Sequence, residues 1–162
     1  MRSIITSNDW RFVIAPVTLN IFGLLLMTAA DNLLTLDHSK MNEIATFLST
    51  ASVWSISVFI LITIILIPML EEWFFRSLTW TFLQRFLSHK VTFHFVALFF
   101  VACHLDVLSM VGLLPFSYYL SWLRRNTGGI GAGIFAHGIF NMTGLMVMLA
   151  QLAYFISMDK LL

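Results

Sequence analysis

Two adjacent carboxylates, Glu71 and Glu72, directly follow a strongly apolar run, and Arg76 comes four residues after the second of them. Residues four apart lie on the same face of a helix, so Glu72 and Arg76 are expected to form an ion pair. Glu71 is turned by about 100° around the helix from its neighbour and points elsewhere. It is therefore free to act as a general base that activates a water molecule. The alternative interpretation is a purely structural ion pair at a membrane interface.

Two imidazoles and an amide could work with such a base. His104 ends the segment FVACH, while His137 and Asn141 are four residues apart in HGIFN and share one helix face. Together with a carboxylate, they suit water activation and the stabilisation of a developing oxyanion. Each also has a structural explanation, because a lone histidine is often a satisfied polar group and a His–Asn pair can join two helices by hydrogen bonds.

A metal site is the other chemistry that this set of side chains permits, because two histidines and a carboxylate can bind zinc. The helical HExxH spacing of zinc proteases is absent. A single cysteine, Cys103, excludes both a disulfide within the chain and a zinc site built on cysteines. The spacing by itself leaves water activation and metal binding both open.

The composition places these groups in an integral membrane protein. Of the 162 residues, 59% are hydrophobic and only 10% are charged, and the mean hydropathy is +0.90. Soluble domains have about 25% charged residues. The formal net charge of +1 provides no strong field for nucleic acid. The expected partner is therefore the lipid bilayer, and no nucleic-acid partner is expected.

The pattern of apolar segments predicts an all-α fold, a polytopic transmembrane bundle of about five to six helices that forms one domain over residues 1–162. The spanning segments are expected to be helical, because the sequence lacks the alternation of a membrane barrel. Pro68 is expected to kink the second span just before the two carboxylates. The helices are expected at about 12–30, in the second half of 31–50, at 51–70 with a continuation to 87, on both sides of a break at 104–106 with the later one ending at 123, and at 130–155.

Glycines are frequent on both sides of His137, where they would allow a neighbouring helix to approach closely. They are Gly128, Gly129, Gly131, Gly133 and Gly138.

The distribution of basic residues predicts that the N-terminus lies in the cytoplasm. Connections rich in Lys and Arg face the cytoplasm in most membrane proteins. If the segment around His104 is a hairpin, the basic residues fall on one side of the membrane and the acidic connection at 31–43 falls on the other. The basic residues are Arg2, Arg11, Arg76, Arg85, Lys90, Arg124 and Arg125.

Three motifs in this order resemble those of the CPBP family of intramembrane proteases, which is named for CAAX-processing endoproteases and bacteriocin-processing enzymes and is also called the Abi family. The motifs are EExxxR at Glu71–Arg76, FxxxH at Phe100–His104 and HxxxN at His137–Asn141. The stretch LRRNTGGIGAGIFAHGIFN also resembles the segment that leads into the third motif of the family. The resemblance covers about residues 55–150, the motif-bearing core of the chain.

The resemblance implies an intramembrane glutamic endopeptidase of the CPBP type in the bacterial cytoplasmic membrane, which acts on a membrane-associated peptide or protein. Members of the family are described both as metal-dependent and as metal-free enzymes. The metal-free description is favoured here, with no metal and no other cofactor, because the histidines lack a local spacing that demands a metal. The implied roles are water activation by Glu71, water positioning by His104, oxyanion stabilisation by His137 and Asn141, and structural support by Glu72 and Arg76.

Two other functions are open at the level of the sequence. Smaller relatives are associated with bacteriocin maturation, self-immunity and peptide signalling, so the chain could be a non-catalytic immunity protein or a subunit of a larger membrane assembly. A haem site that uses His104 and His137 is the third hypothesis, but it leaves Glu71 and Arg76 without a role. The enzyme hypothesis alone requires all four proposed catalytic side chains to converge on one point.

Overall fold

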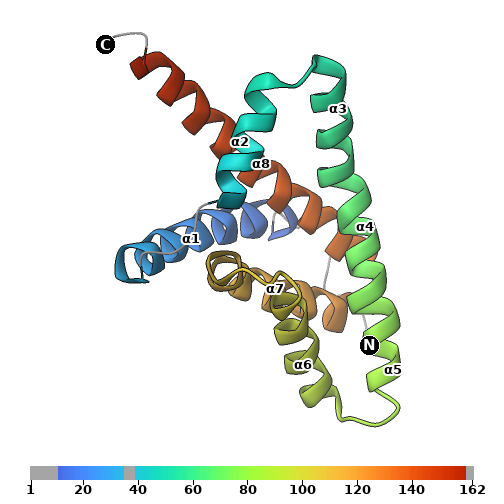
Figure 1. The fold of residues 1–162 in the computed structure, drawn as a ribbon. Helices are drawn as coiled ribbons and strands as arrows, with labels where there is room; N and C mark the ends of the chain where they lie inside the picture. The colour runs from blue at the N-terminus through green and yellow to red at the C-terminus, as the bar shows by residue number, and fades with distance from the viewer. Residues whose placement is uncertain (1–10, 35–38, 160–162) are drawn as a thin grey trace.

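The computed structural model describes residues 11–34 and 39–159, and this part of the chain consists of helices and the turns between them (Figure 1). In chain order the helices are α1 (Arg11–Leu34), α2 (Ser39–Thr50), α3 (Val53–Leu61), η1 (Ile62–Leu66), α4 (Ile67–Glu71), η2 (Glu72–Thr79), α5 (Trp80–Leu83), α6 (His89–Ala102), α7 (Val107–Thr127) and α8 (Gly131–Asp159). Segments α3 to α5 follow one another without a break, so they form one long helix. The described part of the fold therefore has six helices, which confirms the predicted all-α bundle.

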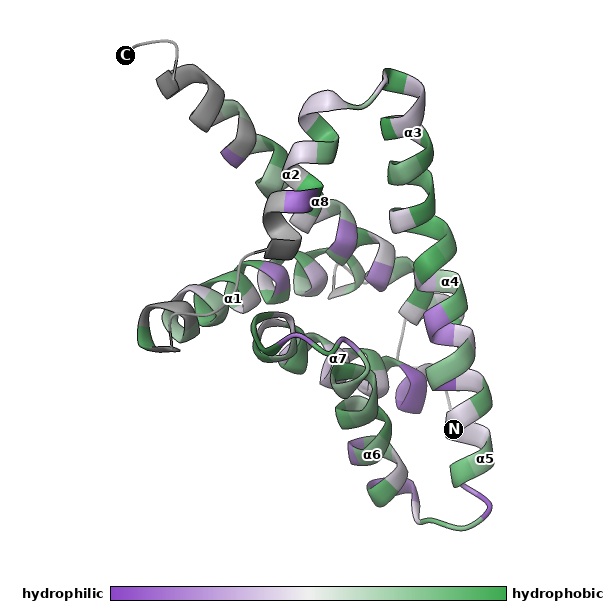
Figure 2. Ribbon diagram, in the orientation of Figure 1, coloured by the Kyte–Doolittle hydropathy of each residue, from purple (hydrophilic) through white to green (hydrophobic). Residues whose placement is uncertain are grey.

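Three of these helices are long and apolar enough to cross a membrane, namely Phe12–Ala30, Val53–Leu83 and Gly131–Gln151. Most side chains of these spans are not buried inside the protein, and Figure 2 shows the long helix as hydrophobic along most of its length. Exposed apolar surface on this scale requires lipid around it rather than water. The chain is thus an integral membrane protein, as its composition predicts.

The turn between α6 and α7 lies where the sequence predicts a break. Leu105 has a positive φ of 52°, and the side chain of Asp106 caps α7 by accepting a hydrogen bond from the N–H of Ser109 at 2.8 Å. Aspartate is a favoured N-cap because its carboxylate pairs N–H groups that have no partner within the helix. At the other end, α7 stops at Gly128, whose φ of 73° is a left-handed conformation that glycine adopts easily.

Helix α7 packs against α1, α6 and α8 and determines where they lie. At the crossing with α1, the two backbones touch, since a Cβ on Gly23 would lie only 2.6 Å from the carbonyl oxygen of Gly112. Towards α8, the rings of Phe116 and Phe140 stack with their centroids 3.8 Å apart within a buried apolar cluster. In Figure 1 the long helix runs along one side of the molecule, and α8 meets it near α4.

The long helix contains two π-helical segments, η1 before Pro68 and η2 after Glu71. In η1 the N–H of Ile67 bonds to the carbonyl of Ile62, five residues back. Pro68 has no N–H to donate. The carbonyl of Thr63 therefore lacks both of the backbone donors that a helix could provide. The helix continues through Pro68, and a π segment stands where the sequence suggested a kink.

Two of the glycines around His137 meet the long helix. A Cβ on Gly133 would lie 2.6 Å from Oε2 of Glu72, and one on Gly138 would lie 2.8 Å from the carbonyl oxygen of Ile64. The predicted close approach of a neighbouring helix is therefore present at these two positions. A Cβ would have open space at Gly128, Gly129 and Gly131.

Candidate active site

The ion pair expected between Glu72 and Arg76 is present and lies inside the protein. Nη1 of Arg76 is 3.2 Å from Oε1 of Glu72, and both side chains are fully buried. Both residues belong to η2. Pairing is essential here, because an isolated charge within a membrane protein carries a large desolvation cost.

Groups from α6 and α7 hold the Arg76 guanidinium. Nη2 donates to Oγ of Ser117 at 3.0 Å, and that hydroxyl donates in turn to the carbonyl of Ala97 at 2.8 Å. The guanidinium carbon lies 4.2 Å from the centre of the Phe100 ring, which is a cation–π contact. Arg76 thus joins the long helix to two others.

Arg124, near the end of α7, binds the backbone of the long helix next to this ion pair. The N–H of Trp80 bonds to the carbonyls of Phe75 and Ser77 and not to the carbonyl of Arg76, the partner it would have in a regular α-helix. Nε of Arg124 donates to the carbonyl of Arg76 at 2.6 Å. A π segment thus again leaves a backbone carbonyl to a side chain from another helix.

His137 of α8 lies between the two carboxylates. Its Nδ1 is 3.2 Å from Oε1 of Glu72, and its Nε2 is 3.5 Å from Oε2 of Glu71. The rings of Phe100 and Phe116 stand edge-on to the imidazole, with centroids 5.8 and 5.4 Å away. An ionised carboxylate only accepts hydrogen bonds, so Nδ1 carries a proton in this arrangement. The imidazole is therefore held in one orientation.

The two carboxylates differ in exposure, in agreement with their different directions on the helix. The side chain of Glu72 is 1% exposed and that of Glu71 is 28% exposed. Oε2 of Glu72 has no hydrogen-bond partner among the described residues and lies against Gly133. Glu71 is thus the carboxylate that a water molecule or a substrate can reach.

Asn141, four residues beyond His137 on α8, binds the first π segment. Its Nδ2 donates to the carbonyl of Thr63 at 2.9 Å, the carbonyl that η1 and Pro68 leave without a backbone donor. This is an interhelical hydrogen bond, the structural alternative to an oxyanion role for Asn141. Together with the contact between His137 and Glu72, it attaches α8 to the long helix at two points.

His104 lies beside this group and is connected to it through Phe100. Its Nδ1 is 2.9 Å from the carbonyl oxygen of Phe100, which can only accept, so Nδ1 carries the proton and Nε2 is an acceptor in the neutral ring. The ring of Phe100 lies 4.9 Å from that of His104 and also contacts the ring of His137. The four residues in direct contact are Glu71, Glu72, Arg76 and His137, and the two that flank them are His104 and Asn141.

Two members of this network, Ser117 and Arg124, are not anticipated from the sequence. A serine inside an apolar helix commonly bonds to a neighbouring helix, so Ser117 carries a signal that could have identified it. Arg124 falls in a stretch that reads only as a charged turn. Nothing local in the sequence indicates that the carbonyl of Arg76 requires a donor.

The arrangement combines an accessible carboxylate with an imidazole that a second, buried carboxylate orients. Such a set can take a proton from water at Glu71 and present an N–H of His137 to a nearby oxyanion. Within residues 11–34 and 39–159, no group of three or more His, Cys, Asp or Glu side chains is arranged so that it could hold a metal ion.

The family model of the Rce1-like type II CAAX prenyl endopeptidases matches residues 52–143, more than half of the chain. Neither a curated protein nor a solved structure matches the chain. The matched region begins just before α3 and ends within α8, so it contains all three motifs and every member of the network around Arg76.

Replacing Ser117 with alanine should destabilise the fold, because Arg76 would lose a buried partner and the carbonyl of Ala97 would lose its side-chain donor from α7. Leaving such groups unpaired costs about 1–3 kcal/mol. We expect a loss in this range in the free energy of unfolding, measured by titrating sodium dodecyl sulfate into protein in mild detergent. The matched control is Ser57→Ala, because Ser57 is exposed and its hydroxyl bonds only within its own helix. Equal stability of Ser117→Ala and the wild type would contradict this role.

Gly133→Ala should also lower the free energy of unfolding, since its Cβ would overlap the buried carboxylate of Glu72. Overpacking of this kind costs about 1–3 kcal/mol. Gly131→Ala is the control, because its Cβ meets no atom and a helical alanine is favoured over glycine by about 0.5–1 kcal/mol. The same detergent titration measures both. If the two variants behaved alike, the close approach of α8 to Glu72 would be wrong.

Proposed function

The chain belongs to the Rce1-like type II CAAX prenyl endopeptidase family, and we propose that it is an intramembrane endopeptidase that cleaves a membrane-associated peptide by a glutamate-type mechanism. The observation that carries the proposal is the position of His137 between the buried carboxylate of Glu72 and the partly exposed carboxylate of Glu71. One carboxylate, held by Arg76, fixes the imidazole, and the other is accessible to water.

In the proposed reaction, Glu71 takes a proton from a water molecule, and the resulting hydroxide attacks the carbonyl carbon of the scissile peptide bond. The carbonyl oxygen becomes an oxyanion, which accepts hydrogen bonds from Nε2–H of His137 and from the second N–H of the Asn141 amide, whose first N–H is bonded to Thr63. The mechanism takes His137 as the imidazolium, with Nδ1–H on Glu72 and Nε2–H available to the oxyanion. When the C–N bond breaks, Glu71 returns its proton to the leaving amine. The products are a carboxylic acid and an amine, and Glu71 is again an ionised base.

The buried carboxylate acts as a positioning residue in this mechanism. Glu72 accepts from Nδ1 of His137 and so directs Nε2 towards Glu71, much as the aspartate of a catalytic triad orients its histidine. His104 is the proposed group that positions the water. Its bond to the carbonyl of Phe100 leaves Nε2 as the acceptor that such a water needs.

An apolar groove next to these residues suits the membrane-embedded part of a substrate. It has a volume of about 480 Å³ and lies between the long helix and α8, with Ile64, Phe135 and Met142 among its lining residues. Gly138, the sequence neighbour of His137, also lines it. An apolar segment in this groove would therefore bring a nearby peptide bond to the proposed catalytic residues.

The proposed location is the bacterial cytoplasmic membrane, with the N-terminus in the cytoplasm. The basis is the positive-inside rule, by which basic connections stay on the cytoplasmic side. Arg85 and Lys90 lie at the connection between α5 and α6, and Arg124 and Arg125 lie near the end of α7.

Glu71→Gln should abolish peptide cleavage without unfolding the protein, because an amide cannot take the proton from water. General-base catalysis contributes about 10²–10⁴-fold to a rate, so we expect a fall of this size. The assay is digestion of a library of apolar peptides by purified protein in bicelles, with new peptide termini identified by mass spectrometry. Glu43→Gln is the matched control, because Glu43 is exposed on α2.

A chelator added to the wild-type reaction should leave the cleavage unchanged. Cleavage at the wild-type rate by Glu71→Gln would overturn the assignment of the base. Cleavage that the chelator abolishes would overturn the metal-free mechanism. Wild-type protein that cleaves none of the peptides would count against the proposed activity itself.

A further inference from the structure

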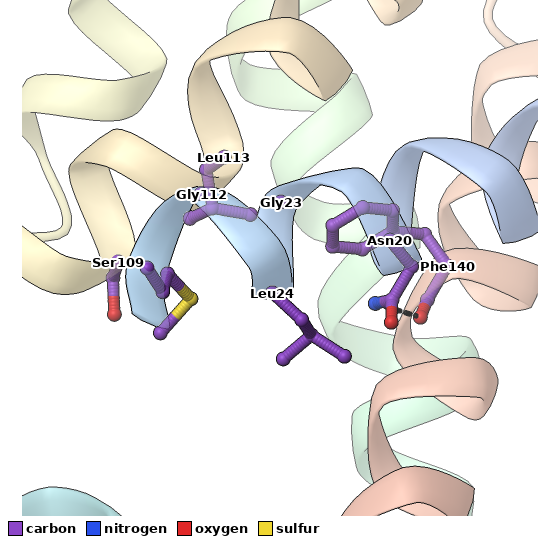
Figure 3. A pocket seen from close by; sticks show the side chains of 8 residues that line it. Asn20, Gly23, Leu24, Ser109, Gly112, Leu113 and Phe140 are labelled. Atoms are coloured by element: carbon purple, nitrogen blue, oxygen red, sulfur yellow. Dashed lines mark hydrogen bonds between the residues drawn. The ribbon is translucent and has the colours of Figure 1, made fainter. Parts of the chain in front are cut away.

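Two open hollows on the surface of the protein differ in the charge of their lining. The hollow in Figure 3 lies between α1, α7 and α8, and its lining has no ionisable side chain. The other lies on the long helix, outside the three motifs, and is lined by Ser77, Leu78, Thr81, Phe82 and Arg85. A charged side chain on a surface that faces lipid needs a partner, so the second hollow is the better candidate for a ligand site.

The lining of this second hollow consists of a polar row and an apolar row. Ser77, Thr81 and Arg85 follow one another at intervals of four residues, so they form one row along the helix. Leu78 and Phe82 form the neighbouring row, and their side chains are 51% and 56% exposed. A ligand of this hollow therefore needs a polar part that pairs with the first row and an apolar part that covers the second.

The polar row runs from inside the membrane span to just beyond its end. The span Val53–Leu83 includes Thr81, whereas Arg85 lies past its last residue. At a rise of about 1.5 Å per residue, the two are about 6 Å apart along the helix axis, with the arginine nearer the water. The long side chain of an arginine at such a position carries its guanidinium to the level of the lipid head groups.

The polar groups of this row are available to a ligand. The exposed hydroxyl of Thr81 makes no hydrogen bond to any described residue, whereas that of Ser57, earlier in the same helix, bonds to a carbonyl one turn back. Every ion pair among the described residues belongs to the network of the candidate active site. Arg85 thus has no carboxylate partner in this part of the chain.

The charge at this end of the protein determines the sign of the ligand. Between Glu72 and Asp106 the chain has no acidic residue, and it has none between Asp106 and Asp159. Arg85 lies in the connection between α5 and α6, and Lys90 lies at the start of α6. Their positive charge favours a lipid with a net negative charge over a zwitterionic one.

We propose that this hollow binds an anionic phospholipid. The phosphate accepts hydrogen bonds from the guanidinium of Arg85, a pairing in which both groups are charged. An ester carbonyl of the lipid accepts one from the hydroxyl of Thr81, and an acyl chain covers Leu78 and Phe82. The phosphate and the ester of a phospholipid follow the same order into the membrane as Arg85 and Thr81 do.

The test compares two lipids with identical palmitoyl and oleoyl chains, the anionic phosphatidylglycerol and the zwitterionic phosphatidylcholine. Their dissociation constants for the purified protein in mild detergent are measured by native mass spectrometry. We expect phosphatidylglycerol to bind the wild type about fivefold more tightly, the factor that one basic side chain near a membrane surface typically supplies. In Arg85→Gln this preference should disappear.

Arg125→Gln is the matched control, because Arg125 is an exposed arginine near the end of α7 that does not line the hollow. This variant loses the same charge but should keep the preference for phosphatidylglycerol. Equal binding of the two lipids to the wild type, or an unchanged preference in Arg85→Gln, would overturn the proposal. An equal loss in both variants would also overturn it, because it would indicate a diffuse attraction between basic residues and acidic head groups.

Two further measurements test the ester contact and the need for acyl chains. Thr81→Val keeps the shape of the side chain but removes its hydroxyl, so it should weaken the binding of both lipids alike, by about fivefold. Unchanged binding of both would overturn the ester contact. Glycerol 3-phosphate has a phosphate but no chains and should not displace phosphatidylglycerol, and displacement at equal concentration would overturn the assignment to a lipid. Because binding is measured directly, the result does not depend on whether the protein cleaves peptides.

Discussion

The buried carboxylate of Glu72 is the group on which the arrangement of the helices depends. A charge inside a membrane protein needs a partner, and Glu72 has two, the guanidinium of Arg76 and the imidazole of His137. Arg76 needs partners in turn and finds them in the hydroxyl of Ser117 and the ring of Phe100. Satisfying one carboxylate thus fixes α6, α7 and α8 against the long helix.

The two π segments make this arrangement possible, because each releases a backbone carbonyl from the long helix. The carbonyl of Thr63 receives a hydrogen bond from Asn141, and that of Arg76 receives one from Arg124. In a regular α-helix both carbonyls would already have a backbone donor, whereas here a side chain from another helix supplies the donor. Single π turns of this kind often occur at functional sites, where they redirect backbone groups and side chains.

Much of this could be predicted from the sequence, because it depends on local spacing. The pairing of Glu72 with Arg76 follows from a separation of four residues, and the break after α6 follows from a polar interruption in an apolar run. The contact between His137 and both carboxylates could not be predicted from spacing alone, because the glycines beside His137 indicate a close approach but do not say which helix comes close. The partnership of Arg124 with a backbone carbonyl was hidden for a further reason: local residue preferences do not reveal π segments.

The attachment of α8 at two positions has a mechanical consequence. A helix that is attached at one residue can rotate about that point. Contacts at both His137 and Asn141, one helical turn apart, prevent α8 from rotating and from sliding along the long helix. An outward movement of α8 would have to break both contacts at once, and Glu72 would then lose His137, one of its two partners. The joint between α8 and the long helix is therefore held rigid beside Glu71 and Glu72.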